Sequence, residues 1–234
     1  MRTAIGVVAA LAVVLAAGAA RAEQVTEPHT KTTFDVERNI GGEQFLLVGV
    51  GARRAGGMIN VYGAGMYVGV KQAVPAWQGY LTGRFAKAGL IEADRPNFQK
   101  LTTSAEARHY IVYGRFPKAI EMAFVRDVSA EQVTGAYNES WDRVGLDQAA
   151  AGEALTQFMA AINGPMTSGQ RMMLRTTGNS IFVTTPRGNT RIAGNNALVT
   201  AIWKIWFGNP CLQAPLRDGM LANLERIQAR LGGN

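Results

Sequence analysis

The chain contains 234 residues, with 24 Lys and Arg against 17 Asp and Glu, which gives a formal net charge of +7 at pH 7. This length suits one large domain with its own hydrophobic core. The positive charges are spread along the chain and form no dense basic run, so the sequence predicts no nucleic-acid partner.

The few cysteine and histidine residues exclude several kinds of site. Cys211 is the only cysteine, which rules out an intramolecular disulfide and a cysteine-rich zinc site, and we expect it to be a buried, unreactive thiol. His29 and His109 are the only histidines, and no Gly-x-Ser-x-Gly segment is present. This composition argues against a Ser-His-Asp hydrolase and a catalytic metal, so we expect neither a metal nor a cofactor.

The first 22 residues have the layout of a secretory signal peptide. Arg2 precedes an apolar stretch at residues 4–19, and small residues flank a cleavage site after Ala22. The stretch is short for a transmembrane anchor, which needs roughly 20 apolar residues. We therefore expect a signal peptide at 1–22, an exposed lead-in at 23–32 and a folded domain at 33–234. Cleavage would remove two arginines and lower the formal charge from +7 to +5. We expect the mature protein to be periplasmic or secreted and to contain no transmembrane segment.

The folded domain begins with a predicted β-hairpin. Residues 45–50 and 58–68 are two apolar runs, and a Gly-Gly turn at 56–57 lies between them. Successive strand residues face opposite sides of a sheet. One face of the second strand therefore carries Tyr62, Ala64, Met66 and Val68. The other face carries Gly63 and Gly65, which leave room either for a ligand or for a helix packed close to the backbone.

The remaining elements follow in chain order and are bounded by capping or turn residues. Ser129 with Gln132 three residues later is typical of a capping box at a helix start. The expected elements are a short helix with loops at 74–92, a strand at 120–125, helices at 129–141 and 150–162, short strands at 170–176, 179–184 and 189–192, and helices at 196–207 and 215–231. This order predicts an α+β domain whose antiparallel sheet carries helices on one face.

Arg53 and Arg54 end the first run of the hairpin. Because neighbouring strand residues face opposite sides, one of the two arginines should point toward the covered face of the sheet. A guanidinium held there needs a partner, and a carboxylate matches its fork of donors, while the hydroxyl of Tyr62 could donate to the same anion. The alternative is a solvated arginine pair at the hairpin end. A dinucleotide-binding loop is excluded, since Arg54 stands where its third glycine is required.

Several segments together resemble the chalcone isomerase-like family. They are Gly49-x-Gly51-x-Arg53, then residues 60–68, 119–129, 192–198 and 205–210, so that the resemblance spans about residues 40–230. It is nearer to bacterial secreted members than to the plant flavonoid enzymes. The resemblance implies an α+β, open-faced β-sandwich, with a large antiparallel sheet covered by helices and a small three-stranded sheet formed by the strands within 170–192.

The resemblance also implies roles for the two polar residues of the hairpin. In the isomerases, an arginine on the first strand and a threonine on the next polarise the substrate, and a tyrosine, a lysine and an asparagine complete the cleft. In the fatty-acid-binding relatives, the arginine and a tyrosine hold a carboxylate instead. Arg53 matches the arginine, and Tyr62 stands at the threonine position, as in the binding branch. The helix after Ser129 lacks the Tyr and Lys of the isomerase pattern.

Three hypotheses follow from the resemblance. The first is a non-catalytic periplasmic protein that binds a fatty acid or a similar carboxylate amphiphile through Arg53 and Tyr62. In this hypothesis Met66 and Met122 line the tail pocket, unless they belong to the core. The second is an intramolecular lyase of chalcone isomerase type, with Arg53 as the electrophilic residue. The third is a structural or interaction module of the cell envelope with a filled cleft.

The sequence leaves other features of the site undecided. It does not determine whether Tyr67, Arg126 or Arg191 joins the two residues of the hairpin. It also gives no indication of the oligomeric state or of protein partners.

Overall fold

The computed structural model describes residues 23–232, so the signal peptide expected at 1–22 lies outside the described residues. The strands are β1 (Gln24–Thr26), β2 (Thr33–Asp35), β3 (Glu37–Ile40), β4 (Glu43–Ala55), β5 (Ile59–Gly69), β6 (Ile91–Glu92), β7 (Arg95–Pro96), β8 (Lys118–Phe124), β9 (Arg171–Thr177), β10 (Ser180–Thr185) and β11 (Gly188–Ile192). The helices are α1 (Val70–Tyr80), continued by the π-helical turn η1 (Leu81–Phe85), α2 (Phe98–Leu101), α3 (Ala105–Tyr113), α4 (Ala130–Val144), α5 (Gln148–Ile162), α6 (Asn196–Phe207), α7 (Ala214–Met220) and α8 (Glu225–Ala229). Within residues 23–232, no helix has the length and apolar character needed to cross a membrane.

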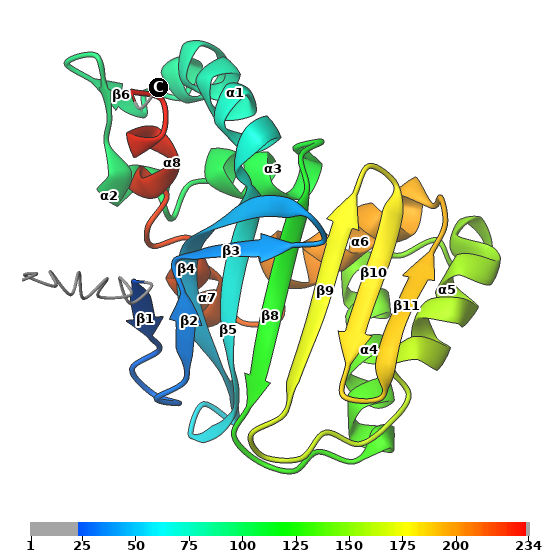
Figure 1. Cartoon of the computed structure of the whole chain (residues 1–234). Helices are drawn as coiled ribbons and strands as arrows, with labels where there is room; N and C mark the ends of the chain where they lie inside the picture. Colours follow the sequence, from blue (N-terminus) through cyan, green and yellow to red (C-terminus); the bar gives the residue numbers. More distant parts are fainter. Residues whose placement is uncertain (1–22, 233–234) are drawn as a thin grey trace, which may run out of the picture.

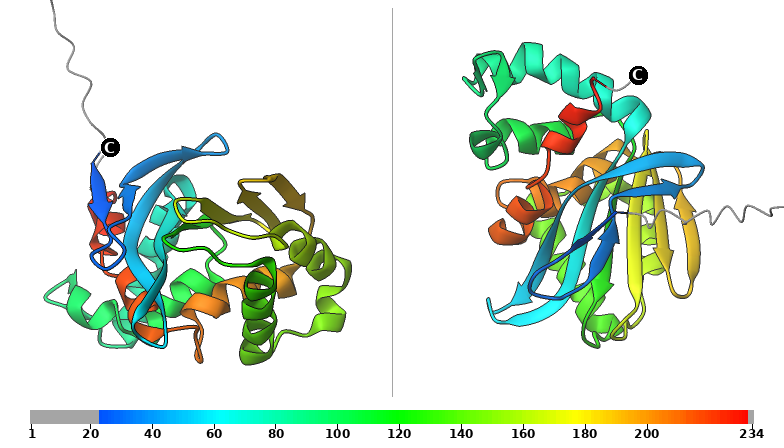
Figure 2. Two further views of the ribbon diagram at one scale, coloured as in Figure 1. Left: turned by 90° about the horizontal axis from the view of Figure 1, so that it is seen from below. Right: turned by 60° about the vertical axis from the view of Figure 1, so that its left-hand side comes forward.

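One curled antiparallel sheet organises the domain, with the strand order β11-β10-β9-β8-β5-β4-β3 (Figure 1). Helices α4, α5, α6 and α7 lie on the same face of this sheet, as the views in Figure 2 show. This arrangement confirms the expected α+β fold with a helix-covered antiparallel sheet. The three strands expected to form a separate small sheet instead continue the large one, because β9 pairs with β8 from Lys118↔Thr176 to Ala123↔Arg171.

The expected hairpin is formed by β4 and β5, which pair antiparallel. The helix-facing side of β5 has the predicted composition, and its side chains join the main core: Tyr62, Ala64, Met66 and Val68. Two β-bulges interrupt the pairing, one between Leu47 and Gly49 and one between Arg53 and Arg54. A bulge adds a residue to one strand and so changes which face the following residues point to.

Two glycines on the helix-facing side of β4 allow α7 to lie directly on the strand backbone. A Cβ atom at Gly49 would overlap the carbonyl oxygen of Gly219, and one at Gly51 would overlap the carbonyl oxygen of Leu216. Only residues without a side chain permit this approach. The close helix packing that the sequence offered as an alternative for β5 therefore occurs on the neighbouring strand.

The glycines of β5 face the other side of the sheet, where the β1–β2 hairpin covers them. A Cβ atom at Gly63 would overlap the hydroxyl of Thr32, and one at Gly65 would crowd the ring of Phe34. The protein's own N-terminal hairpin therefore fills the space that the sequence assigned to a ligand or a helix.

The lead-in expected at 23–32 is exposed at most of its side chains but is built into the fold. Its first part, β1, pairs with β2. Glu27 is only 1% exposed, and its carboxylate accepts hydrogen bonds from the backbone N–H groups of His29 and Thr30 and from the Thr30 hydroxyl. The side-chain amide of Asn60 on β5 also donates to the carbonyl oxygen of His29 at 2.8 Å, a long-range contact that the polar composition of the segment did not reveal.

The helix expected at 215–231 is interrupted and forms α7 and α8. The chain between them turns toward β4, where the backbone N–H of Asn223 donates to the carbonyl oxygen of Val48 at 2.9 Å. Gly219 also lies so close to Val50 that a Cβ atom would overlap its carbonyl oxygen. The contact with β4 thus replaces helical hydrogen bonds at this point, although the apolar spacing of the sequence continues through it.

Lys118 is a buried cation at the start of β8. It is 2% exposed, and its Nζ donates to the carbonyl oxygens of Ile111 at 2.6 Å and Gly114 at 2.8 Å, at the C-terminal end of α3. The rings of Phe116 and Trp203 lie within 5.3 Å of Nζ. Burial lowers the pKa of Lys118 from its ordinary value of 10.5 to about 7.

The buried amine predicts a pH dependence of stability. Between about pH 7 and pH 10 the unfolded chain keeps the Lys118 proton while the folded chain loses it, so stability should rise with pH by at most about 1.4 kcal/mol per pH unit. Lys118→Met should lack this rise. Urea unfolding of both proteins between pH 7 and 10 measures the difference, and parallel stability profiles would show that burial does not perturb this amine.

Candidate functional site

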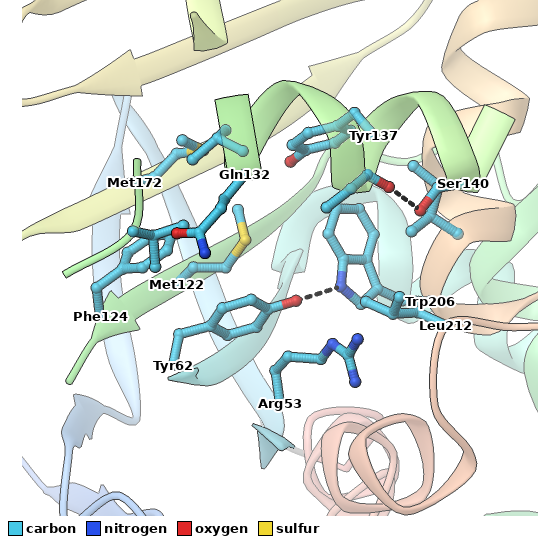
Figure 3. Close-up of a pocket in the computed structure, with 14 residues that line it drawn as sticks. Arg53, Tyr62, Met122, Phe124, Gln132, Tyr137, Ser140, Met172, Trp206 and Leu212 are labelled. Atoms are coloured by element: carbon cyan, nitrogen blue, oxygen red, sulfur yellow. Dashed lines mark hydrogen bonds between the residues drawn. The ribbon is translucent and has the colours of Figure 1, made fainter. Parts of the chain in front are cut away.

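A cavity of about 90 Å³ lies between the helix-covered face of the sheet and α4 (Figure 3). The residues that line it come from β4, β5, β8, β9, α4, α6 and the adjoining loops: Arg53, Tyr62, Met122, Phe124, Val128, Gln132, Val133, Ala136, Tyr137, Ser140, Met172, Ile205, Trp206 and Leu212. Both residues selected from the sequence, Arg53 and Tyr62, thus line the same cavity.

The register of the hairpin places Arg53, and not Arg54, at this cavity. Arg53 pairs with Tyr62 across β4 and β5, so the two side chains lie on the same face of the sheet. The backbone N–H and carbonyl oxygen of Arg54 bond to the side-chain amide of Gln213, at 3.1 and 3.3 Å. Gln213 immediately precedes α7, so the packing of α7 on β4 also fixes the strand end that carries Arg53.

Arg53 has only neutral hydrogen-bond acceptors among the described residues. Its Nη1 donates to the carbonyl oxygen of Arg54 at 3.1 Å and to Oε1 of Gln213 at 3.4 Å. No carboxylate within residues 23–232 lies within 4.0 Å of it to form an ion pair. A guanidinium has five N–H donors in a fixed fork, so Arg53 retains donors for a planar anion.

The hydroxyl of Tyr62 is held in place by Trp206. The indole Nε1 of Trp206 donates to this hydroxyl at 3.3 Å, which leaves the proton of Tyr62 free to be donated elsewhere (Figure 3). Burial raises the pKa of Tyr62, and the hydrogen bond from Trp206 and the charge of Arg53 oppose this shift. Tyr62 therefore stays protonated at neutral pH and can act as a hydrogen-bond donor beside the guanidinium.

Tyr137 contributes a buried hydroxyl that has no hydrogen-bond partner among the described residues. The residue is 8% exposed, lies on α4 and lines the cavity. Burial, and to a lesser degree the neighbouring Tyr62, raises the pKa of Tyr137. An unpaired buried hydroxyl costs stability, so its retention at a cavity is typical of a group that bonds to a ligand.

The remaining wall of the cavity is apolar, and one of the two predicted methionines contributes to it. Met122 on β8 lies beside its cross-strand partner Met172 on β9, and both line the cavity. Met66 is fully buried in the core outside the lining, which agrees with the alternative that it belongs to the core. The side chains of Met66 and Tyr62 lie on the same face of the sheet, but Met66 is further along β5 and does not reach the cavity.

The other residues that the sequence left undecided lie away from this cavity. Tyr67 is on the opposite sheet face, where its hydroxyl donates to the carbonyl oxygen of Asp35 at 3.0 Å. Arg126 is exposed on the loop after β8, and Arg191 lies near the ring of Phe182 on β10. The thiol expected to be buried, Cys211, is only partly buried.

Sequence reasoning missed most of the polar end of the cavity. Tyr137 and Trp206 were recognisable only as members of apolar helical stripes, on α4 and α6, and nothing in those stripes distinguishes a core aromatic from a cavity aromatic. Gln132 was identified as a helix cap, and the structure confirms the capping box with Ser129. One signal could have identified these two aromatic residues as part of a polar site: Tyr and Trp each carry a polar atom that needs a hydrogen-bond partner when it is buried.

The fold is an open-faced β-sandwich in which helices cover one face of a curled antiparallel sheet, with an apolar cavity between the two layers. The sequence profile of the chalcone isomerase-like family matches residues 101–222, or 122 of 234 residues. The chain therefore belongs to the chalcone isomerase-like family. Among solved structures it is similar to a fatty-acid binding protein of Arabidopsis thaliana, with a TM-score of 0.66 and 16% identity over 88% of this chain and 98% of that chain. No curated protein sequence matches the chain.

The unpaired hydroxyl of Tyr137 predicts that Tyr137→Phe raises the free energy of unfolding by about 1 kcal/mol, because a buried donor without a partner is removed. Tyr110→Phe is the matched control. The hydroxyl of Tyr110 is also buried but donates to the carbonyl oxygen of Ala73 at 2.8 Å, so its removal should cost about 1 kcal/mol. Chemical denaturation of both variants gives the two values. Equal destabilisation by both changes would mean that the Tyr137 hydroxyl is paired in solution.

Proposed function

We propose that this protein is exported to the periplasm or secreted and binds a fatty acid or a similar carboxylate amphiphile without catalysis. The observation that carries the proposal is the position of Arg53. Its guanidinium lines an apolar cavity beside the free donor of Tyr62 and forms no ion pair with a described carboxylate.

The polar end of the cavity suits an anion with a single charge. Among residues 23–232, Arg53 is the only charged residue that lines it, and the neighbouring hydroxyls of Tyr62 and Tyr137 are neutral. A carboxylate accepts two parallel bonds from a guanidinium and has further lone pairs for a hydroxyl donor. In this arrangement the carboxylate of the ligand is the counter-charge of Arg53, and Tyr62 and Tyr137 donate hydrogen bonds to the same carboxylate.

The apolar lining suits a hydrocarbon tail, but the cavity is small. Pockets for drug-sized ligands measure roughly 300–1,000 Å³, against about 90 Å³ here. A carboxylate and the first carbons of a tail fit this volume, and a longer tail requires the lining to move. Met122 and Met172 are unbranched and flexible, so we expect the tail to displace them as it passes between the sheet and α4.

Binding is favoured over catalysis by the kind of residues that line the cavity. The part of the chain that the structure describes contributes no His, Lys, Asp or Glu to the lining, and these are the side chains that most often transfer protons near neutral pH. Its two tyrosines have raised pKa values because they are buried, which makes their deprotonation harder. The fatty-acid binding protein with a similar fold supports the same choice by analogy only.

Export is tested separately from binding. The apolar stretch at 4–19 and the small residues before Glu23 support cleavage after Ala22. N-terminal sequencing of the protein recovered outside the cytoplasm should therefore start at Glu23. Recovery of the uncleaved chain in the cytoplasmic fraction would contradict export and leave the proposed binding unaffected.

Arg53→Gln should lower the affinity for a long-chain fatty acid by about tenfold or more, because a charged hydrogen bond contributes about 1.5–3 kcal/mol. Arg54→Gln is the matched control, since it removes the same charge one residue along β4 but outside the cavity lining. It should change affinity by less than about twofold. Titration calorimetry with saturated fatty acids of increasing length measures both effects.

Native mass spectrometry with organic extraction complements this titration, because it detects a ligand that is already bound. The wild-type protein should carry a fatty acid that Arg53→Gln loses. Equal affinity of the two arginine variants, or a wild type that binds no fatty acid of any length, would overturn the proposal.

A further inference from the structure

Two adjoining cavities lie away from the Arg53 cavity, along the packed helices α3 and α6. They measure about 370 and 620 Å³ and share Val112 and Tyr113 in their lining. Both are larger than the cavity of about 90 Å³ at Arg53. Neither contains a residue used in the proposed fatty-acid site.

The lining of these cavities has a one-sided charge. Of the residues that the structure describes, five basic residues and no Asp or Glu line them: Arg108, Arg143 and Lys204 in the first cavity, and Arg115 and Lys118 in the second. His109 also lines the first cavity. We call this pair of cavities the basic groove.

The cations of the basic groove bond only to neutral groups. Nη1 of Arg108 donates to the carbonyl oxygen of Thr103 at 2.7 Å, and Nη1 of Arg143 approaches the Ser140 hydroxyl at 3.5 Å. No ion pair within 4.0 Å joins Arg108, Arg143, Arg115, Lys118 or Lys204 to a carboxylate of residues 23–232. Elsewhere in the fold, ion pairs do compensate basic residues, as at Arg38 and Arg171 with Glu121.

Like charges that face the same concave surface repel one another, and their fields add within it. The resulting potential attracts an anion. Three cations at one cavity suit a ligand with two or more negative charges, because a monocarboxylate would leave the site with excess positive charge. Arginine and lysine both bind phosphate groups, and a phosphate monoester carries about two negative charges at neutral pH.

The wall of the basic groove also contains aromatic surface. Tyr113 is 51% exposed at the junction of the two cavities, and its ring centroid lies 4.6 Å from that of His109. Nδ1 of His109 and the hydroxyl of Tyr80 share a hydrogen bond of 2.7 Å, which fixes the imidazole. These rings give the groove a rigid apolar side next to its cations.

We propose that the basic groove between α3 and α6 binds a phosphate-bearing anion, with Arg108, Arg143 and Lys204 as the principal contacts. The phosphate belongs either to a small soluble molecule or to an anionic phospholipid whose headgroup is a phosphate monoester. In the second case the groove would hold the protein at a lipid surface.

The test uses the whole protein, inorganic pyrophosphate as the soluble probe, and vesicles of phosphatidic acid, which is a phosphate monoester, and phosphatidylcholine as the lipid probe. Arg143→Gln/Lys204→Gln removes two charges from the groove. Lys87→Gln/Arg126→Gln removes two charges from exposed positions outside both cavities and serves as the matched control. Thermal melting of each variant checks that it is folded.

The groove variant should bind its probe at least about tenfold more weakly than wild type, with a change below about twofold in the control. Calorimetry with pyrophosphate at constant ionic strength, with acetate as the monoanion comparison, identifies a soluble source. Sedimentation with vesicles identifies a lipid source if only the vesicles bind.

Two outcomes would overturn the proposal. In the first, the wild-type protein binds neither probe. In the second, the groove variant and the control lose equal affinity, which would show that the net charge of the protein, and not the groove, attracts the anion.

Discussion

The direct packing of α7 on the backbone of β4 is the contact on which the Arg53 cavity depends. Gly49 and Gly51 make this approach possible because a side chain at either position would overlap a carbonyl oxygen of α7. Gln213, just before α7, then holds the backbone of Arg54 through both its N–H and its carbonyl oxygen. The end of β4 is thereby fixed, and Arg53 is directed into the cavity between the sheet and α4.

The two proposed anion sites differ in the number of charges that they leave uncompensated. The Arg53 cavity has one guanidinium, two tyrosyl hydroxyls and apolar walls, which suit a monocarboxylate with a tail. The basic groove has several cations, more polar walls and no carboxylate from residues 23–232, which suits a dianion. Both sites contain basic side chains without a carboxylate partner among the described residues, an arrangement that lowers the stability of the fold. Such residues are expected where ligand binding, and not stability, determines which residue occupies a position.

The sequence predicted the local parts of the fold well. Alternation along residues 58–68 assigned both faces of β5 correctly, and the capping box at Ser129 located the start of α4. Two parts failed for the same reason. The lead-in at 23–32 is held against β5, where the side-chain amide of Asn60 donates to the carbonyl oxygen of His29 and Thr32 lies close to Gly63. The final helix is broken by contacts of Gly219 and Asn223 with β4. Both depend on partners far away in the sequence.

For the candidate site, the sequence by itself determined the hairpin, the pairing of an arginine with a tyrosine, and which side chains share each face of β5. Only the tertiary structure decided which arginine enters the cavity, because the bulge after Arg53 and the anchoring by Gln213 set the register. It also decided that Tyr137 and Trp206 complete the polar end. Periodicity indicates which side of an element is buried, whereas the packing of distant elements decides whether that side faces core or cavity.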